Sequence, residues 1–297
     1  KYVNSPPFIT APTASQQEEL VELDQRLKEA RLVLADMDEE INSGQQVWED
    51  SLVGSSDIDA DVDWNLKDGL IVHHALDGDI SGVHAGKVVD ATLEDGLPHF
   101  VDGRIGTAAS FDGQRYIDAG MPPNLGYEDE FTLSAWIYPN VDNGVIFSRA
   151  NEGDQGEVGW GLYIEGGKLR LNLSTRVLDD GVAAETTQAI QLDRWQHVAA
   201  TYDGSKTPEG MRIYVNGIEQ ELEGLLDLVG NRLPQRYPLR IGASGSTKPN
   251  FQGSIDDVRI YDRVLEPEEI AVVSTAETIS LIASLDPSKR EKAQSDK

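Results

Sequence analysis

The chain has 297 residues, 39% of them hydrophobic, which suits one large domain with a buried core plus an additional segment. Its formal net charge of −27 argues against nucleic acid and anionic membrane surfaces as partners, because both are negatively charged. The absence of cysteine excludes disulfides, a Cys-ligated zinc site and a thiol nucleophile, and the apolar runs are too short for membrane insertion.

The N-terminal part of the chain predicts a long helix. Residues 1–14 are expected to be an extended lead-in, because three prolines within them oppose a helix. Ser15 and Glu18 have the spacing of a capping box, and apolar residues then recur at alternating intervals of three and four. This heptad pattern predicts a coiled-coil-like helix over 15–50. Its apolar stripe needs a covering partner: a second copy of the chain, the domain that follows, or a segment of a longer parent protein.

The rest of the chain has the pattern of a β protein. Residues 51–64 are rich in Ser and Asp without periodicity, and they predict a linker. From there on, short alternating runs are separated by Gly, Asp and Asn, and Asn216-Gly217 is typical of a hairpin turn. These runs predict a mostly β fold, an antiparallel two-sheet sandwich over 65–265. A short C-terminal helix over 266–286 and a charged tail over 287–297 complete the predicted order.

Six strand-and-turn segments follow one another along the predicted sandwich. They are Gly69–Gly78, Gly106–Gly113, Phe131–Ile137, Trp195–Gly204, Ile213–Gly217 and Ile255–Arg263. Together they resemble the LamG-like (laminin G-like) family of concanavalin A-like jelly-roll domains. The resemblance implies a jelly-roll sandwich, but it implies no particular ligand, because one fold can serve many functions.

The flanking segments carry a second resemblance. The Pro-rich lead-in, the heptad helix, the sandwich, and then Glu266–Ile270 and Asp286–Gln294 resemble the central region of large planctomycete proteins. In those proteins, cytochrome-c-like modules and domains of unknown function flank a LamG-like insert. This chain contains no CxxCH haem motif, so no electron-transfer role follows. The resemblance implies a middle domain of a larger protein that is extracellular, periplasmic or in the cell envelope.

The LamG-like resemblance also implies a structural Ca²⁺ between the opening turn and the last strand. The matching positions are Asp77, the carbonyl of Gly78, and Asp256. Calcium prefers carboxylate, carbonyl and water oxygens, which a turn beside a strand provides. The alternative is that Asp77 and Gly78 form only a turn and that Asp256 is an ordinary strand residue.

One motif raises the possibility of catalysis. Glu152, Asp154 and Glu157 match the ExDxxE pattern of related sandwich glucanases, in which two carboxylates serve as nucleophile and general acid/base. The intervening residues are Gly, Gln and Gly, which indicate a flexible loop. Such a loop would not hold carboxylates with the accuracy that catalysis requires. We therefore expect no enzymatic activity.

A polar strand face is the candidate ligand site. Alternation over 168–174 places three leucines on one face and Arg170 and Asn172 on the other. The leucines are expected in the core. Arg170 and Asn172, with Arg149 and Tyr163 as expected neighbours, are candidates for binding a sugar. The alternative is an ordinary solvated face, as is usual for the outside of a sandwich.

The sequence therefore favours a noncatalytic binding or interaction module, for a glycan or protein ligand, within a larger exported or envelope protein. One alternative is a glycoside hydrolase of the glucanase-like sandwich class. A second is a structural spacer or oligomerisation unit that pairs through the heptad helix.

Overall fold

The computed structural model describes residues 14–52, 66–96, 98–153, 156–176 and 180–277, with short C-terminal pieces at 282–283, 285–286 and 289–290. The chain divides into two compact units, one containing the N-terminal helix and the other the β-rich region from Asp63. The expected lead-in through residue 13, nearly all of the expected linker and most of the expected tail lie outside the described residues.

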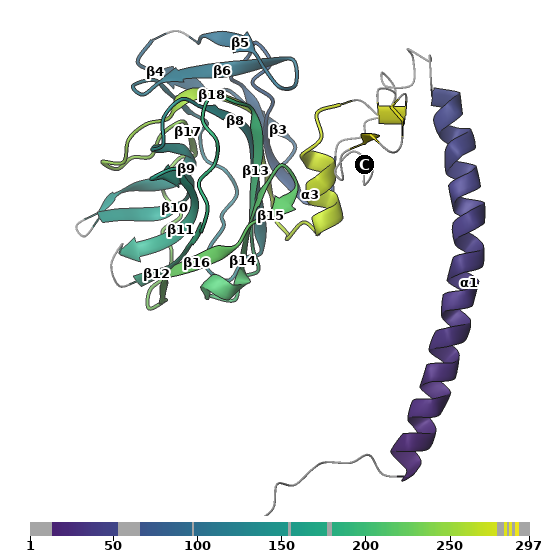
Figure 1. The fold of residues 1–297 in the computed structure, drawn as a ribbon. Coiled ribbons are helices and arrows are strands. Elements are labelled where there is room, and N and C mark those ends of the chain that lie inside the picture. Colours follow the sequence, from purple (N-terminus) through teal and green to yellow (C-terminus); the bar gives the residue numbers. More distant parts are fainter. Residues whose placement is uncertain are drawn as a thin grey trace, which may run out of the picture. The chain divides into compact units, whose positions relative to one another are not determined.

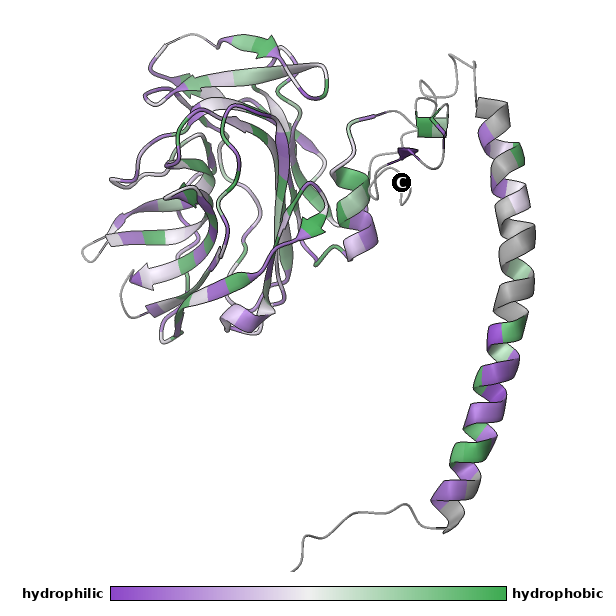
Figure 2. Ribbon diagram, in the orientation of Figure 1, coloured by the Kyte–Doolittle hydropathy of each residue, from purple (hydrophilic) through white to green (hydrophobic). Residues whose placement is uncertain are grey.

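The first unit contains helix α1 (Ala14–Leu52), whose 39 residues span the region that the heptad pattern predicts. Leu20, Leu27 and Met37 of its apolar stripe are about half exposed, at 53%, 50% and 51%. Figure 2 shows green apolar and purple polar residues along this helix. None of the helices in the described part of the chain is long and apolar enough to cross a membrane.

The second unit is a sandwich of two antiparallel sheets (Figure 1). The first sheet has the order β15-β14-β13-β8-β18-β1-β2-β3, with β6 and β5 attached at β18. Its strands are β1 (Leu70–His74), β2 (Gly82–His84), β3 (Lys87–Val89), β5 (Phe100–Asp102), β6 (Thr107–Asp112), β8 (Phe131–Pro139), β13 (Gln196–Tyr202), β14 (Met211–Val215), β15 (Ile218–Glu219) and β18 (Gln252–Tyr261). The second sheet has the order β16-β12-β11-β10-β9-β17-β7-β4. Its strands are β4 (Thr92–Glu94), β7 (Tyr116–Asp118), β9 (Gly144–Gly153), β10 (Gly156–Glu165), β11 (Lys168–Arg176), β12 (Asp180–Thr186), β16 (Leu222–Leu228) and β17 (Arg240–Ile241).

The core lies between the sheets, where every second side chain of a strand points inward. Phe131 and Leu133 of β8 are fully buried there, as are Leu169, Leu171 and Leu173 of β11. Burying each of these side chains contributes about 2 kcal/mol. The structure confirms the mostly β, two-sheet fold class. The apolar residues that alternate in the sequence are the ones whose side chains point into the core.

Helix α3 (Pro267–Val273) packs its apolar side on the outer surface of the first sheet. A capping box that includes Glu266 starts it, where the sequence predicts a helix. It ends after seven residues, because the hydroxyl of Ser274 donates a 2.9 Å hydrogen bond to the carbonyl of Ala271 in competition with the helical backbone. The expected continuous helix through residue 286 is thus corrected to this shorter one.

The hairpin of β1 and β2 buries two histidines at the side of the first sheet. His74 and His84 are 0% and 5% exposed, and their Nε2 atoms lie 3.0 Å apart. The ring of His74 lies against Gly82, where an added Cβ would come within 2.3 Å of the ring. Burial lowers the pKa of His74 to about 4, so both rings are packed as neutral groups near neutral pH.

Candidate functional site

Three of the four residues predicted to bind a ligand share the outward face of the second sheet. Tyr163 in β10 is directly opposite Arg170 in β11, and Asn172 follows two residues later on the same face. Arg170 donates a 2.7 Å hydrogen bond to Glu185 and forms an ion pair with Glu165. The charge of Arg170 is therefore neutralised within the sheet, and Tyr163 is only 1% exposed.

Arg149 does not join this face, which corrects the sequence expectation. In the β9–β10 pair it is directly opposite Trp160, a core residue. Directly opposed residues of an antiparallel pair point to the same side, so the Arg149 side chain lies on the inner side of the sheet. The residue is 1% exposed.

The buried guanidinium of Arg149 joins two loops that are distant in sequence. Its Nε donates to the carbonyl of Tyr237 at 2.8 Å, and its Nη1 donates to the carbonyl of Pro123 at 3.2 Å. Both Nη1 and Nη2 donate to Gln235, at the side-chain Oε1 (2.8 Å) and the backbone carbonyl (2.6 Å). Nη2 also donates to Asn124 Oδ1 at 3.1 Å. Arg149 thus fixes the β7–β8 loop against the β16–β17 loop.

These two loops, with the β13–β14 loop, form a pocket of about 360 Å³, which we call the loop pocket. Most of its lining residues are polar, with amides, carboxylates and two cations, while polar and apolar atoms contribute similar shares of the lining surface. The lining residues are Asn124, Gly126, Tyr127, Glu128, Asp129, Lys206, Val229, Asn231, Arg232, Leu233 and Gln235.

The rim of the loop pocket offers hydrogen-bonding groups of both kinds. Asn124 uses its oxygen to accept from Arg149, and its amide nitrogen makes no hydrogen bond within the described residues. Lys206 is paired with Glu128 at 2.5 Å. Arg232 is exposed and makes no hydrogen bond to any part of the chain that the structure describes. The pocket can therefore donate to and accept from a polar ligand.

A buried aspartate holds the second side of the loop pocket. Asp180, at the start of β12, is 1% exposed and accepts hydrogen bonds from the backbone N–H of Gly230 (2.7 Å) and Asn231 (3.3 Å). Burial opposes its ionisation, but these hydrogen bonds prevail and lower the pKa of Asp180 to about 2. Burial, with the nearby charge of Asp180, raises the pKa of Tyr127, so the phenol in the pocket lining stays neutral.

Sequence reasoning missed the loop pocket because its residues lie in loops, which have no hydrophobic period. One signal was available in the sequence. Asn124 follows Pro122 and Pro123, and Gln235 follows Pro234. Prolines restrict the backbone beside each amide, so a polar amide at such a position is held in place more firmly than in an ordinary loop.

Glu152 and Glu157 of the ExDxxE segment lie in paired strands rather than in a flexible loop. Glu152 is the last but one residue of β9 and Glu157 is the second residue of β10, and the two are directly opposite each other. Asp154 lies outside the described residues. Glu157 is 3% exposed, and its carboxylate accepts a 2.9 Å hydrogen bond from Ser246 Oγ. Burial raises the pKa of Glu157. Glu152 is exposed and accepts from the backbone N–H of Thr247. The expectation of loosely held carboxylates is wrong, because both belong to a paired ladder.

The residues predicted to hold calcium meet at the loop before β6. Asp77 Oδ1 accepts from the backbone N–H of Thr107 at 2.5 Å, and Asp256 Oδ2 accepts from the N–H groups of Arg104 and Ile105, both at 2.9 Å. The other oxygen of Asp256, Oδ1, is buried and has no hydrogen-bond partner in the described part of the chain. Burial, with Asp77 among the nearby charges, raises the pKa of Asp256 to about 7.

This cradle fits a cation in part. An orphaned carboxylate oxygen beside a second carboxylate is a preferred setting for an oxygen-liganded ion. Gly78 lies in the turn directly after Asp77. No group of three His, Cys, Asp or Glu side chains that could hold a metal occurs within the described residues. Backbone carbonyls and water would therefore have to supply the remaining ligands.

Residues 111–271 match the family Laminin_G_3, described as the concanavalin A-like lectin/glucanases superfamily. The chain belongs to this superfamily. It is 27% identical over 148 residues to the adhesion G-protein coupled receptor V1 of Danio rerio, a match that covers 47% of this chain and 2% of the receptor. The lectin/glucanase domain thus spans only a small part of that relative's length.

Two solved structures share the fold of this lectin/glucanase domain. The botulinum neurotoxin serotype C1 binding domain has a TM-score of 0.51 and 15% identity, covering 70% of this chain and 52% of that one. A Trypanosoma rangeli sialidase in complex with sialic acid has a TM-score of 0.50 and 18% identity, covering 69% and 32%. At these identities the likeness is one of fold, and it agrees with the concanavalin A-like resemblance.

Proposed function

We propose that this lectin/glucanase-superfamily chain is a noncatalytic binding module that recognises a glycan in the loop pocket. The proposal rests on the buried Arg149, whose hydrogen bonds hold Asn124 and Gln235 from the core side. A pocket whose polar groups are fixed in advance loses little conformational entropy when it binds a ligand.

The chemistry of the loop pocket favours a glycan over an apolar ligand. Its volume of about 360 Å³ is in the range of small-ligand sites. Its amides, carboxylates and Arg232 can exchange hydrogen bonds with sugar hydroxyls. An apolar ligand would instead leave those groups desolvated and unpaired, at a cost of about 1–3 kcal/mol for each.

We expect Arg232→Ala to weaken glycan binding roughly tenfold, since it removes a charged donor from the pocket rim. The substitution changes no hydrogen bond within the described residues, so the thermal midpoint should stay the same. A glycan array, with and without Ca²⁺, identifies the sugar, and calorimetry on the best sugar measures the loss. Lys87→Ala is the control, because Lys87 is an exposed cation of β3 that does not line the pocket. Equal losses in both variants, or no glycan bound at all, would contradict the proposal.

The competing proposal is a glycoside hydrolase that uses Glu152 and Glu157, with Asp154 as the third carboxylate. We disfavour it because a general acid must contact the glycosidic oxygen, and Glu157 is 3% exposed beside Ser246. The same array, read for released sugar, separates the two functions. Hydrolysis that disappears in Glu157→Gln would establish the enzyme.

We also propose a structural Ca²⁺ held by Asp77, the Gly78 carbonyl and Asp256. Saturating Ca²⁺ is expected to raise the melting temperature, because an ion at a hundred times its Kd stabilises the fold by about 2.7 kcal/mol, or roughly 8 °C for a domain of this size. EDTA should reverse the shift, and Asp256→Asn should abolish it. Asp95→Asn, at an exposed aspartate that is not part of this cradle, should keep it. An unchanged melting temperature with Ca²⁺ and with EDTA would remove the ion from the proposal.

The setting of the module is part of the proposal. The resemblance to planctomycete proteins and the LamG-like fold support a place within a larger exported or envelope protein, with a glycan or protein as ligand. The half-exposed stripe of α1 supports a second role, as a spacer or oligomerisation segment.

A further inference from the structure

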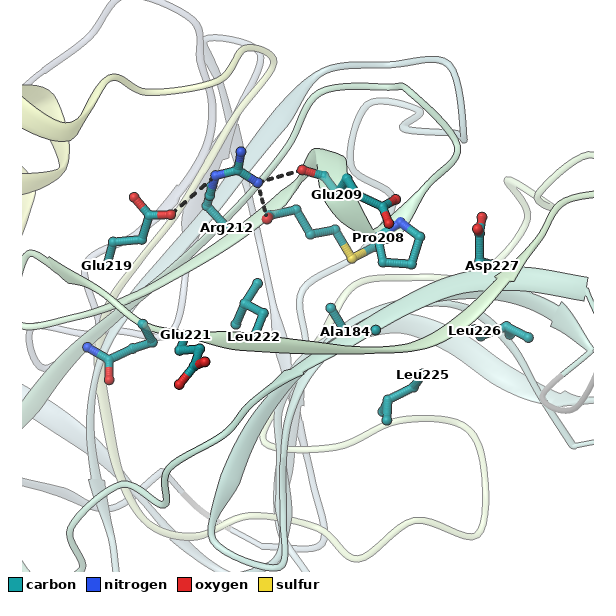
Figure 3. Close-up of a pocket in the computed structure, with 13 residues that line it drawn as sticks. Ala184, Pro208, Glu209, Arg212, Glu219, Glu221, Leu222, Leu225, Leu226 and Asp227 are labelled. Carbon is teal, nitrogen blue, oxygen red and sulfur yellow. Dashed lines mark hydrogen bonds and ion pairs between the residues drawn. The ribbon is translucent and has the colours of Figure 1, made fainter. Parts of the chain in front are cut away.

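A second pocket lies where both sheets end, and we call it the edge groove. It has a volume of about 580 Å³ and lies between the ends of the two sheets (Figure 3). One wall comes from the 3-10 turn η1 (Pro208–Gly210), from β14 and from Glu219 of β15. The other wall comes from β16, with Leu222 and Leu225 among its residues. None of the residues considered for glycan, calcium or catalysis lines it.

The edge groove is bordered by two terminal strands. Within the described part of the chain, β15 pairs only with β14, and β16 pairs only with β12. The seven residues of β16 therefore carry a row of backbone N–H and C=O groups that the sheet does not use. Native edge strands are usually protected by lysine, proline, a bulge or a covering segment. The β16 strand has a bulge in its pairing with β12, and Pro208 of η1 packs near Gly224, but β16 itself contains neither lysine nor proline.

The side chains of β16 add apolar surface to this free edge. Leu225 is 41% exposed and Leu228 is 58% exposed, and Ile218 on the adjoining β15 is 63% exposed. An extended peptide that pairs with β16 would cover these side chains while its own backbone satisfies the unused groups. Strand addition of this kind obtains affinity from the backbone and specificity from alternate side chains.

The charges of the edge groove indicate the chemistry of the occupant. Four carboxylates line it, from Glu209, Glu219, Glu221 and Asp227. The one cation, Arg212, is already engaged: it pairs with Glu219 at 3.2 Å and donates to the backbone carbonyl of Glu209 at 2.5 Å. The carboxylates of Glu209 and Asp227 have no ion pair within the described residues. The groove is therefore negative, and like charges would oppose the edge of a second copy.

We propose that the edge groove binds an extended, cationic segment of a partner protein, which adds to β16 as a further strand. Its alternate Lys or Arg side chains would face Glu209 and Asp227, which lie on the same side of β16 (Figure 3), and its intervening apolar side chains would cover Leu225 on the other side. This interaction uses a different surface from the loop pocket, so the module can hold a glycan and a protein at once.

The test uses the full chain and a synthetic peptide with capped ends and the repeating sequence Lys-Val, with a Glu-Val peptide of the same length for comparison. Fluorescence anisotropy should detect binding of the Lys-Val peptide alone, weaker at high salt because the contact is charged. The double variant Glu209→Gln/Asp227→Asn should bind it at least roughly tenfold more weakly. The control Glu94→Gln/Asp95→Asn makes the same change of charge at exposed positions of the β4 turn, and it should bind like the parent.

Hydrogen exchange locates the contact independently of charge. Amides of β16 should gain protection with the Lys-Val peptide, whereas those of β4 should not. Equal weakening in the two double variants would mean nonspecific attraction to an acidic protein and would overturn the proposal. Protection elsewhere, or absence of binding, would overturn it as well.

Discussion

Replacing Arg149 with methionine is expected to lower the free energy of unfolding by about 3–5 kcal/mol, or roughly 10 °C in melting temperature. The guanidinium is 1% exposed and donates five hydrogen bonds, three of them to backbone carbonyls. Methionine keeps most of the apolar stem but leaves those carbonyls buried without donors. Urea titration at neutral pH measures the loss.

The matched control for this prediction is Arg170→Met. Arg170 also carries several charged contacts, but it lies on the solvated face, where ion pairs contribute at most about 1 kcal/mol. The Arg149 variant should also lose glycan binding, because the β7–β8 and β16–β17 loops lose their common anchor. Similar stability losses in the two variants would show that Arg149 is not a structural anchor.

The buried His74 is expected to lower the free energy of unfolding by about 2 kcal/mol when the pH falls from 7 to 5. Burial lowers the pKa of His74 in the folded chain to about 4, whereas an unfolded imidazole titrates near about 6.5. Between these two values the unfolded chain binds a proton that the folded chain does not. The stabilisation that comes from keeping His74 neutral is therefore fully present above about pH 6.5, and it is lost as the pH falls towards 4.

A difference between two variants isolates this effect from other titrating groups. Buried acids with raised pKa values, such as Asp256, make the folded protein more stable as the pH falls. In the parent protein they would mask the loss of stability that His74 causes. His74→Gln should therefore lose about 2 kcal/mol less than the parent between pH 7 and pH 5, measured by urea unfolding. His99→Gln, at an exposed histidine, is the control. A His74→Gln variant whose pH dependence matches the parent would contradict the prediction.

The two proposed binding surfaces differ in what would disturb them. The loop pocket depends on Arg149 and Asp180, which are buried, so its geometry and the stability of the domain change together. The edge groove depends on exposed carboxylates and an unused strand edge, so it can be altered without unfolding the sandwich. Variants in each surface should leave binding at the other unchanged.

The sequence by itself determined the sandwich, because a period of two sends alternate residues to opposite faces whatever the strand order. Leu169, Leu171 and Leu173 were assignable to the core from that period alone. The hydroxyls after residue 273 end α3 early by a local competition that the apolar pattern does not report.

The candidate sites were decided by tertiary structure, because they depend on strand register and on contacts across long stretches of chain. Arg149 meets Gln235, which is 86 residues away, and its inward direction follows from being paired with Trp160. Likewise, the Gly and Gln of the ExDxxE segment suggested a loose loop, but the register of β9 on β10 places Glu152 opposite Glu157. Local patterns fix which residues can be strands, and only the pairing of those strands fixes which side chains meet.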